Sequence, residues 1–531
     1  MNFINSNLLS LITFLPLLGM ILVLVTPSGR IKLIQWGSVA FSLIPFALGL
    51  VLWASFDQTS SNFQFVEQAN WFPQINASYK VGVDGISLPL VVLNAFLTPL
   101  VMLISMRIEK AIKPFYALLF LFAAATSGVF ISLDLVLFFV FYELTLVPMY
   151  FLINQWGGAN RRYASLKFFL YTLFAGLAML LATQVIGLAS GSFDLEYLMS
   201  EAGRPFTGSN TVNALWGNMN TWKSVAFFSF FIAFALKIPV WPLHTWLPDA
   251  HTEAPTGGSM LLAGIMLKLG GYGFLRIVLP LFPDASAKYA WVLAALAMLS
   301  IVVGAFAAWG QNDFKKLVAY SSVNHMGFTA LGIAVLAKLM GSHVETEMGA
   351  TALQSAAIAS NGAVLQMVTH GLSSAAMFAL VGVVYDRAHT RDLTKFGGLW
   401  NLMPKYGAIL IFCAMGSLGL PGLAGFVSEF LVTSAGWSGF TFYTALSMVG
   451  LLVTGIYILK ALQKVLHGPL GHEWEHHPLT DINRTEILGI APLMIAMLIL
   501  GLYPTGLLNL INTGSLKLID LASKAVEAVA R

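Results

Sequence analysis

The 531-residue sequence has one cysteine, Cys413, and few charged side chains. A single cysteine excludes a disulfide framework, a zinc site of the CxxC kind and a cysteine-ligated iron–sulfur cluster. Charged residues make up only 10% of the chain and hydrophobic residues 57%, a balance that no soluble core of this size requires. The sequence therefore predicts an integral membrane protein with no soluble domain, no metal site and no cofactor of its own. The net charge of +4 is small, and no basic stripe with interleaved aromatics suggests nucleic acid as a partner.

Apolar runs long enough to cross a bilayer, about 20 residues each, follow one another along almost the whole chain. They predict an all-α polytopic membrane protein, a single transmembrane domain over residues 1–531 with about fourteen helices. Lysine and arginine are more frequent in the turns that follow odd-numbered runs, which predicts that both termini lie on the positive, outer side. We place the helices at 6–26, 32–55, 82–106, 115–133, 135–154, 163–189, 223–243, 257–280, 288–310, 314–337, 362–385, 406–435, 440–463 and 485–510.

Six ionisable side chains lie deep within these runs, each in a different helix. Lys268, for example, is roughly 16 Å from the start of its run at the usual helical rise. A charge at bilayer depth costs at least about 2.5–3.5 kcal/mol, so six are a heavy burden unless they pair or line a hydrated path. For the carboxylates and lysines a static buried salt bridge is the alternative, and for each histidine a packing role is as good an interpretation as a relay. The six are Glu143, Lys237, Lys268, His325, His370 and Glu429.

These residue types suit proton transfer. Desolvation disfavours the charged form of lysine and of glutamate, whereas a nearby opposite charge favours it. A pair of this kind can therefore load or release a proton when the distance between its members changes. Histidine exchanges protons near neutral pH without help.

Two of the runs contain prolines close to an ionisable residue. In "FALKIPVWPLHTWLPDAHTEAPT", residues 234–256, Pro239 and Pro242 predict that the helix stops just after Lys237. Pro421 in "GSLGLPGLAGFVSEF" repeats this arrangement before Glu429. Unwound backbone at this depth is tolerated where protein shields it or where it lines a cavity, and paired broken helices point to the transport site of an inverted-repeat transporter. Weaker candidates follow the first break: His244, Asp249 and His251.

Five stretches together resemble a known family. They are "FYELTLVPMYFLI", "KIPVWPLHTWLPDAHTEAPTGGSMLLAGIMLKLGGYG", "DFKKLVAYSSVNHMG", "MVTHGLSSAAMF" and "LPGLAGFVSEF", and they resemble the antiporter-like membrane subunits of proton-pumping NADH-quinone oxidoreductase, respiratory complex I. The resemblance implies two inverted five-helix repeats, helices 4–8 and 9–13, with helices 7 and 12 broken. It divides the chain into 1–114 for helices 1–3, 115–280 and 281–470 for the repeats, and 471–531 for helix 14 and a short tail.

The resemblance also implies roles for the buried residues. Glu143 looks like the carboxylate that pairs with Lys237 in the input half-channel, and Lys268 resembles the lysine that links the halves. His325 and then His370 follow it, and Glu429 looks like the terminal group of the exit half-channel. The other pumping subunits and the related cation/proton antiporters usually have lysine at that last position. Glu429 therefore favours the chain 4 (subunit M) branch, which has a counterpart in the photosynthetic form of the complex.

The resemblance thus implies a proton-translocating subunit of a translocase that contains no redox centre itself. Flavin, iron–sulfur clusters and quinone are expected in partner subunits, and the partners are the sibling antiporter-like subunits, protons and lipid. The membrane is expected to be a bacterial plasma membrane or a cyanobacterial or chloroplast thylakoid rather than the mitochondrial inner membrane. The electron donor, NADH, NADPH or ferredoxin, does not follow from this chain.

Two alternative functions stay open at this point. A subunit of a multisubunit cation/proton antiporter would use the same residues without redox partners, although Glu429 argues against it. A structural scaffold would hold pumping siblings in line and keep its buried charges static. Two further stretches are interpreted as surface: the polar link 338–363 and the histidine-rich loop 467–478, "HGPLGHEWEHHP".

Overall fold

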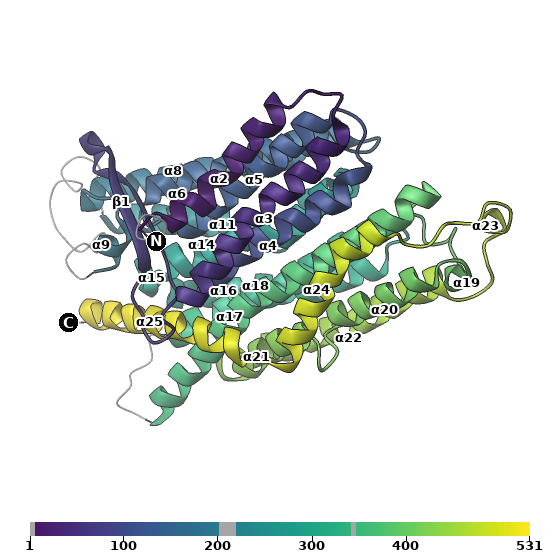
Figure 1. Cartoon of the computed structure of the whole chain (residues 1–531). Coiled ribbons are helices and arrows are strands. Elements are labelled where there is room, and N and C mark those ends of the chain that lie inside the picture. Colours follow the sequence, from purple (N-terminus) through teal and green to yellow (C-terminus); the bar gives the residue numbers. More distant parts are fainter. Residues whose placement is uncertain (1–5, 201–218, 341–346, 531) are drawn as a thin grey trace.

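The computed structural model describes residues 6–200, 219–340 and 347–530 of the chain (Figure 1). Long helices run between two ends, with the β hairpin and both termini at the left end in Figure 1 and α19 and α23 at the right end. The prediction of an all-α polytopic membrane protein is confirmed, because eleven helices in the described part are long and apolar enough to cross a membrane. The expected number of fourteen spans stays a prediction.

The N-terminal part consists of three long helices and a hairpin. Its elements are α2 (Leu8–Val25), α3 (Ile31–Ser55), β1 (Gln64–Phe72), η1 (Pro73–Ile75), β2 (Ala77–Val83), α4 (Leu88–Ile104) and η2 (Ser105–Arg107). The two strands pair antiparallel. The sequence did not predict this hairpin, and the helix expected from residue 82 begins at Leu88 instead.

The hairpin contacts two distant segments of the chain, the start of α2 and the acidic residues Asp194 and Glu196. The carboxylate of Glu67 on β1 accepts hydrogen bonds from the backbone N–H groups of Leu9 and Ser10 in the first turn of α2, at 2.8 and 3.2 Å, and from the Ser10 hydroxyl. A carboxylate there satisfies two helix donors that have no partner within the helix and favours the positive end of its dipole. On β2, desolvation opposes the charge of Lys80, but hydrogen bonds to Asp194 and Glu196 outweigh it and raise the pKa of the lysine.

We expect Glu67→Ala to destabilise the fold by about 2 kcal/mol, because it removes charge-assisted hydrogen bonds and leaves buried N–H groups without partners. The midpoint of thermal unfolding of the detergent-solubilised protein should fall by a few degrees. Gln68→Ala, the exposed neighbour on the same strand, is the control. An equal midpoint for the two variants would contradict the assigned role of Glu67.

The middle part leads to the first break. Its elements are α5 (Ile112–Ile131), α6 (Leu135–Leu144), α7 (Leu146–Trp156), α8 (Arg161–Ser190), α9 (Leu195–Met199), α11 (Met219–Lys237), α12 (Trp246–Glu253), α13 (Thr256–Leu261), η3 (Leu262–Met266), α14 (Lys268–Gly273), η4 (Phe274–Val278) and α15 (Leu279–Leu281). The stretch from Thr256 to Leu281 is one continuous, wholly buried span in which η3 and η4 are π-helical turns.

The C-terminal part carries the second break. Its elements are α16 (Pro283–Trp309), α17 (Phe314–Leu339), α18 (Glu347–Ala388), α19 (Leu399–Leu402), α20 (Pro404–Leu418), α21 (Ala424–Gly439), α22 (Thr441–Leu466), α23 (His472–His476), α24 (Arg484–Leu502) and α25 (Thr505–Ala530). The interpretation of 338–363 as a polar link is wrong for most of that stretch, because α17 continues to Leu339 and α18 begins at Glu347. Residues 341–346 lie outside the described residues. The tail after Pro504 is helix α25.

At two places, a pair of backbone hydrogen bonds joins two segments that are far apart in the sequence. We call each such pair of hydrogen bonds a backbone crossing. Near β2, the N–H of Leu135 donates to the Phe193 carbonyl and the N–H of Leu195 donates to the Leu133 carbonyl. Between the start of α17 and the turn after α18, the N–H of Phe314 donates to the Arg391 carbonyl and the N–H of Leu393 donates to the Asn312 carbonyl. Each crossing contains an isolated antiparallel bridge between two aspartates, Asp134 with Asp194 and Asp313 with Asp392.

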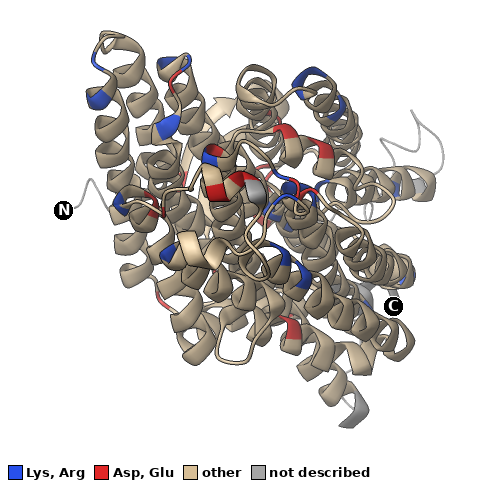
Figure 2. Cartoon of the chain, turned by 90° about the vertical axis from the view of Figure 1, so that its right-hand side faces the viewer, with Lys and Arg blue, Asp and Glu red and all other residues tan. Residues whose placement is uncertain are grey.

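Charged side chains are scarce along the helices and gather at the turns. Figure 2 looks along the molecule onto the end that carries α19 and α23, where lysine, arginine and acidic residues lie in the connecting segments and most of the ribbon is uncharged. Many helices expose large apolar side chains outward, including Leu452 at 70%, as a lipid-facing surface does.

Candidate functional site

The first break follows Lys237 directly. Helix α11 ends at this residue and α12 begins at Trp246, with Pro239 and Pro242 between them. The backbone groups that the break releases find partners, because the Trp246 indole donates to the Leu236 carbonyl at 3.1 Å and the Trp241 N–H donates to the Ser300 hydroxyl at 2.7 Å. The interruption is thus a built feature of the interior, as nonhelical backbone at this depth has to be.

The second break separates α20 from α21. Helix α20 ends at Leu418, Gly419 takes a left-handed conformation with φ +84°, and Pro421 precedes the start of α21 at Ala424. Only glycine adopts this conformation without steric cost. Glu429 lies on α21 and is 5% exposed.

Glu143 and Lys237 face a common interior space without forming a direct ion pair. Lys237 is fully buried, and its Nζ lies 4.6 Å from the centre of the Tyr142 ring and has no hydrogen-bond partner. Oε1 of Glu143 is also buried without a partner. Buried polar atoms are nearly always hydrogen-bonded, so these two atoms on neighbouring helices are exceptions within the described structure.

The carboxylate of Glu143 is held against helix α8 at Gly176. A Cβ added to Gly176 would lie 1.9 Å from Oε1 of Glu143. Only the absence of a side chain at this position makes room for the carboxylate, so Gly176 determines where Glu143 points.

Gly176→Ala should therefore displace the Glu143 carboxylate by an ångström or more, and we expect proton transport to fall several-fold because transfer depends steeply on geometry. The measurement is the rate of proton uptake by vesicles that contain the assembled protein. Gly37→Ala is the matched control, because a Cβ on this glycine of α3 would meet nothing within 4 Å. An unchanged rate for Gly176→Ala would show that the position of Glu143 does not matter.

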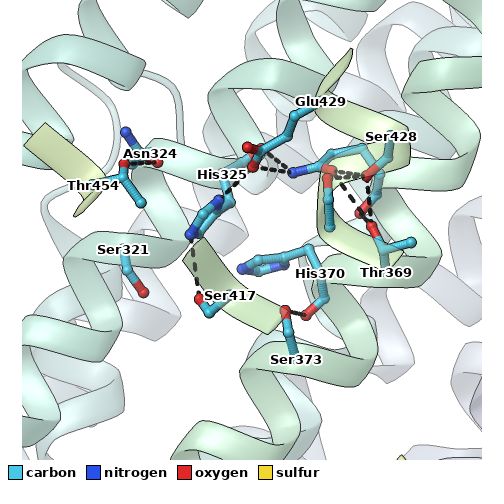
Figure 3. Close-up of polar contacts among 12 residues, drawn as sticks. Ser321, Asn324, His325, Thr369, His370, Ser373, Ser417, Ser428, Glu429 and Thr454 are labelled. Carbon is cyan, nitrogen blue, oxygen red and sulfur yellow. Dashed lines mark hydrogen bonds and ion pairs between the residues drawn. The ribbon is translucent and has the colours of Figure 1, made fainter. Parts of the chain in front are cut away.

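The other four buried residues form a connected line. Nζ of Lys268 lies 2.8 Å from Nδ1 of His370, and the rings of His370 and His325 lie 5.8 Å apart, centre to centre. Nδ1 of His325 lies 2.7 Å from Oε1 of Glu429 (Figure 3). The order along the line is therefore Lys268, His370, His325, Glu429, and His370 rather than His325 is next to the lysine.

The lysine at the start of this line sits between two irregular turns. Lys268 is the first residue of α14, and the π-helical turns η3 and η4 flank that short helix. Its Nζ also donates to the Ala263 carbonyl in η3. Turns of this kind widen a helix locally and occur often at functional sites, where they free backbone carbonyls for other partners.

Polar side chains that the sequence analysis did not single out surround the other end of the line. Gln366, one turn before His370 on α18, donates to Oε1 of Glu429 at 3.2 Å and to the His325 carbonyl at 3.1 Å. Ser428 donates to Oε1 of Gln366, and Thr369 lies 2.9 Å from Ser428. Gln366 is uncharged and had no motif to mark it; only its position four residues before His370 could have pointed to it.

The three weaker candidates do not join this line by direct contact. Asp249 pairs with Lys167 at 2.7 Å at the edge of a polar cavity of about 220 Å³. His251 is fully buried and stacks on Phe378, and neither of its ring nitrogens has a hydrogen-bond partner. The ring of His244 lies 6.1 Å from that of Tyr320.

The chain is similar to known membrane proteins in sequence and in fold. Residues 132–456 match the model of the family described as NADH:quinone oxidoreductase/Mrp antiporter, TM. The chain is 38% identical over 97% of its length to the NADH-quinone oxidoreductase subunit M of Rhodobacter capsulatus, and the match covers 97% of that protein.

Two solved structures are similar to this one. A chain of respiratory complex I from Thermus thermophilus with bound NADH has a TM-score of 0.81 and 28% identity, and the match covers 96% of this chain and 99% of that one. A chain of the Mrp complex from Dietzia sp. DQ12-45-1b has a TM-score of 0.78 and 21% identity, with 99% of each chain covered, and shows the fold alone.

Proposed function

Since the chain belongs to the NADH:quinone oxidoreductase/Mrp antiporter family of membrane proteins, we propose that it carries protons across the membrane as a subunit of a complex I-type NAD(P)H or ferredoxin:quinone oxidoreductase. Electron transfer in other subunits drives the transport. The single observation that carries this proposal is the connected line of Lys268, His370, His325 and Glu429 in the buried interior.

Each residue has a task in this proposal. Glu143 controls the charge on Lys237 next to the first break, and Lys268 takes the proton onward to His370. The rings of the two histidines lie 5.8 Å apart, centre to centre, and the proton passes between them in one short step. Glu429 receives the proton from His325 and releases it at the second break. Pro239, Pro242 and Pro421 keep the backbone open at the two ends of the path.

The two backbone crossings support a duplicated architecture for residues 115–280 and 281–470. Both crossings use the same pair of backbone hydrogen bonds around an aspartate bridge. Asp134 and Asp313 each cap a following helix by accepting from the N–H groups two and three residues on. The first crossing adjoins the hairpin at the left end in Figure 1, whereas the second adjoins the turn next to α19 at the right end. Two similar units in opposite orientation are what an inverted repeat requires. Residues 1–114, of which the structure describes 6–114, and 471–531, described to residue 530, flank this pair.

The partners follow from the same family. We infer that sibling antiporter-like subunits adjoin the chain, that lipid covers its apolar outer surface, and that flavin, iron–sulfur clusters and quinone reside in other subunits. Relatives from bacteria and cyanobacteria support a bacterial plasma membrane or a thylakoid rather than a mitochondrial inner membrane.

A cation/proton antiporter subunit is the second candidate, because the family includes the Mrp antiporters and the Mrp chain shares the fold. The carboxylate at position 429 favours the first candidate, because the resemblance associates glutamate there with the chain 4 (subunit M) branch, whereas the antiporters usually have lysine. Sodium-dependent proton movement in the absence of quinone would favour the antiporter.

The proposal is tested by measuring quinone reduction and proton uptake together in inverted vesicles while one buried charge at a time is neutralised. A proton-carrying subunit loses coupled activity although the complex assembles. A scaffold subunit with static charges keeps the wild-type ratio of protons to electrons.

A further inference from the structure

The two oxygens of the Glu429 carboxylate have different surroundings. Oε1 accepts from Nε2 of Gln366 at 3.2 Å and lies 2.7 Å from Nδ1 of His325. Oε2 has no hydrogen-bond partner, and a Cβ on Gly419 in the second break would lie 3.3 Å from it. One oxygen therefore faces the histidine line and the other faces the unwound backbone.

The amide of Gln366 can have only one orientation in this setting. Its Oε1 accepts from the Ser428 hydroxyl, and its Nε2 donates both to Glu429 and to the His325 carbonyl. A flipped amide would place its acceptor oxygen against the Glu429 carboxylate and the His325 carbonyl and lose the hydrogen bonds to both. Gln366 is 2% exposed and connects α17, α18 and α21 at the point where the proton passes from one helix to the next.

We propose that Gln366 is a positioning residue that gives the Glu429 carboxylate a receiving oxygen and a releasing oxygen. By holding Oε1 toward His325, Gln366 directs proton acceptance to that side and leaves Oε2 turned to the break at Gly419. The proton passes from Nδ1 of the His325 imidazolium to Oε1 of Glu429, which leaves His325 neutral. A half-turn of the neutral carboxyl group about its Cγ–Cδ bond then brings the O–H to the Gly419 side, where the proton leaves and the carboxylate is restored. This inference rests on the proposed function, since it assigns a direction to the last step of the same line.

Among the described residues around Glu429, the other polar groups do not hold its carboxylate toward His325 as Gln366 does. The titratable groups that face it are His325 from α17, His370 behind His325 on α18, and Tyr457 from α22, whose hydroxyl lies 3.5 Å from Nε2 of His325. Helix α20 contributes Ser417, which lies 3.4 Å from the same nitrogen. Helix α24 brings the apolar Met497 against α20. Beside these groups, Gln366 is the uncharged residue that donates a hydrogen bond to the carboxylate.

The test uses three variants of the assembled complex in inverted vesicles. Gln366→Met keeps the volume and removes the hydrogen bonds, and Gln366→Glu restores a donor when its carboxyl group is protonated. Asn361→Leu is the matched control, because Asn361 on the same helix donates to Asn512 at 2.8 Å, away from the line. The measured quantities are the rate of quinone reduction, the ratio of protons to electrons, and their dependence on pH.

We expect Gln366→Met to lower the rate about tenfold or more, because it removes a hydrogen bond to a charged group. Because the amide donor stabilises the charged carboxylate, its loss should move the acid limb of the activity profile to higher pH. Gln366→Glu should recover part of the rate on the acid side. Asn361→Leu should leave the profile where it is in the wild type.

A wild-type pH profile for Gln366→Met, or an equal change in Asn361→Leu, would overturn the inference and leave Gln366 a structural residue. Glu429→Gln separates this failure from failure of the proposed function. If Glu429→Gln loses coupled activity while Gln366→Met changes nothing, only the directional inference is wrong; if Glu429→Gln keeps wild-type coupling, the proposed function itself is wrong. In the Glu429→Gln background, Gln366→Met should cause no further change.

Discussion

We expect quinone reduction coupled to proton uptake to fall at least about tenfold in Lys268→Met, because the line then starts at a residue that cannot hold a proton. Lys268 is fully buried, and its Nζ contacts only the Ala263 carbonyl and His370 among the described residues. No other ionisable side chain contacts Nδ1 of His370 in the part of the chain that the structure describes. Methionine fills similar space, so the variant should assemble, which blue-native electrophoresis of the membranes would check.

Lys268→Arg distinguishes a proton carrier from a static charge. Arginine keeps the positive charge but does not release its proton at physiological pH, whereas a lysine at a buried site can. We therefore expect Lys268→Arg to lose coupled activity almost as fully as Lys268→Met. Retention of wild-type rates in Lys268→Arg, with loss only in Lys268→Met, would show that the site needs a charge and not proton exchange.

Glu143→Gln should have the next largest effect, because it neutralises the carboxylate next to Tyr142, whose ring lies 4.6 Å from Nζ of Lys237. A pair that is not in direct contact can strengthen its attraction by moving closer and weaken it by moving apart, which is how the charge on Lys237 would be switched. The neutral amide cannot do this. Glu143→Asp keeps the acid and shortens the side chain by one methylene, so it should retain part of the activity that Glu143→Gln loses.

Much of the fold was accessible from the sequence because the bilayer imposes simple rules. Long apolar runs have to be helices when water cannot satisfy the backbone, and each of these runs overlaps a described helix. The breaks were also predictable, since proline inside such a run has a known effect on backbone hydrogen bonding, and α11 and α20 end directly before the predicted positions.

The features that were missed depend on contacts between distant segments. The hairpin is held in place by the hydrogen bond that Glu67 accepts from the start of α2 and by the ion pair between Lys80 and Asp194. Neither contact leaves a periodic pattern in the sequence. The first turns of α18 are rich in alanine, serine and threonine and contain few large apolar residues, so composition alone suggested a link. Small residues permit close packing between membrane helices.

The sequence identified the residues of the candidate site by their type, but it did not predict how they are arranged in space. Charges in apolar runs identified all four members of the line, because burying them requires a reason. Their order was not accessible: His370 follows His325 in the chain yet lies next to Lys268, since α18 packs against η3 while α17 packs against α21. An uncharged residue such as Gln366 gives no such signal, and only the three-dimensional contacts identify it.

The measurement that tests the central claim most directly is simultaneous quinone reduction and proton uptake in inverted vesicles carrying Glu143→Gln, after assembly of the complex has been confirmed. Proton transfer through this chain predicts that both activities fall together, by about tenfold or more. Wild-type rates with a wild-type ratio of protons to electrons would mean that the buried charges are static, and the assignment of this chain as a proton carrier would then be wrong.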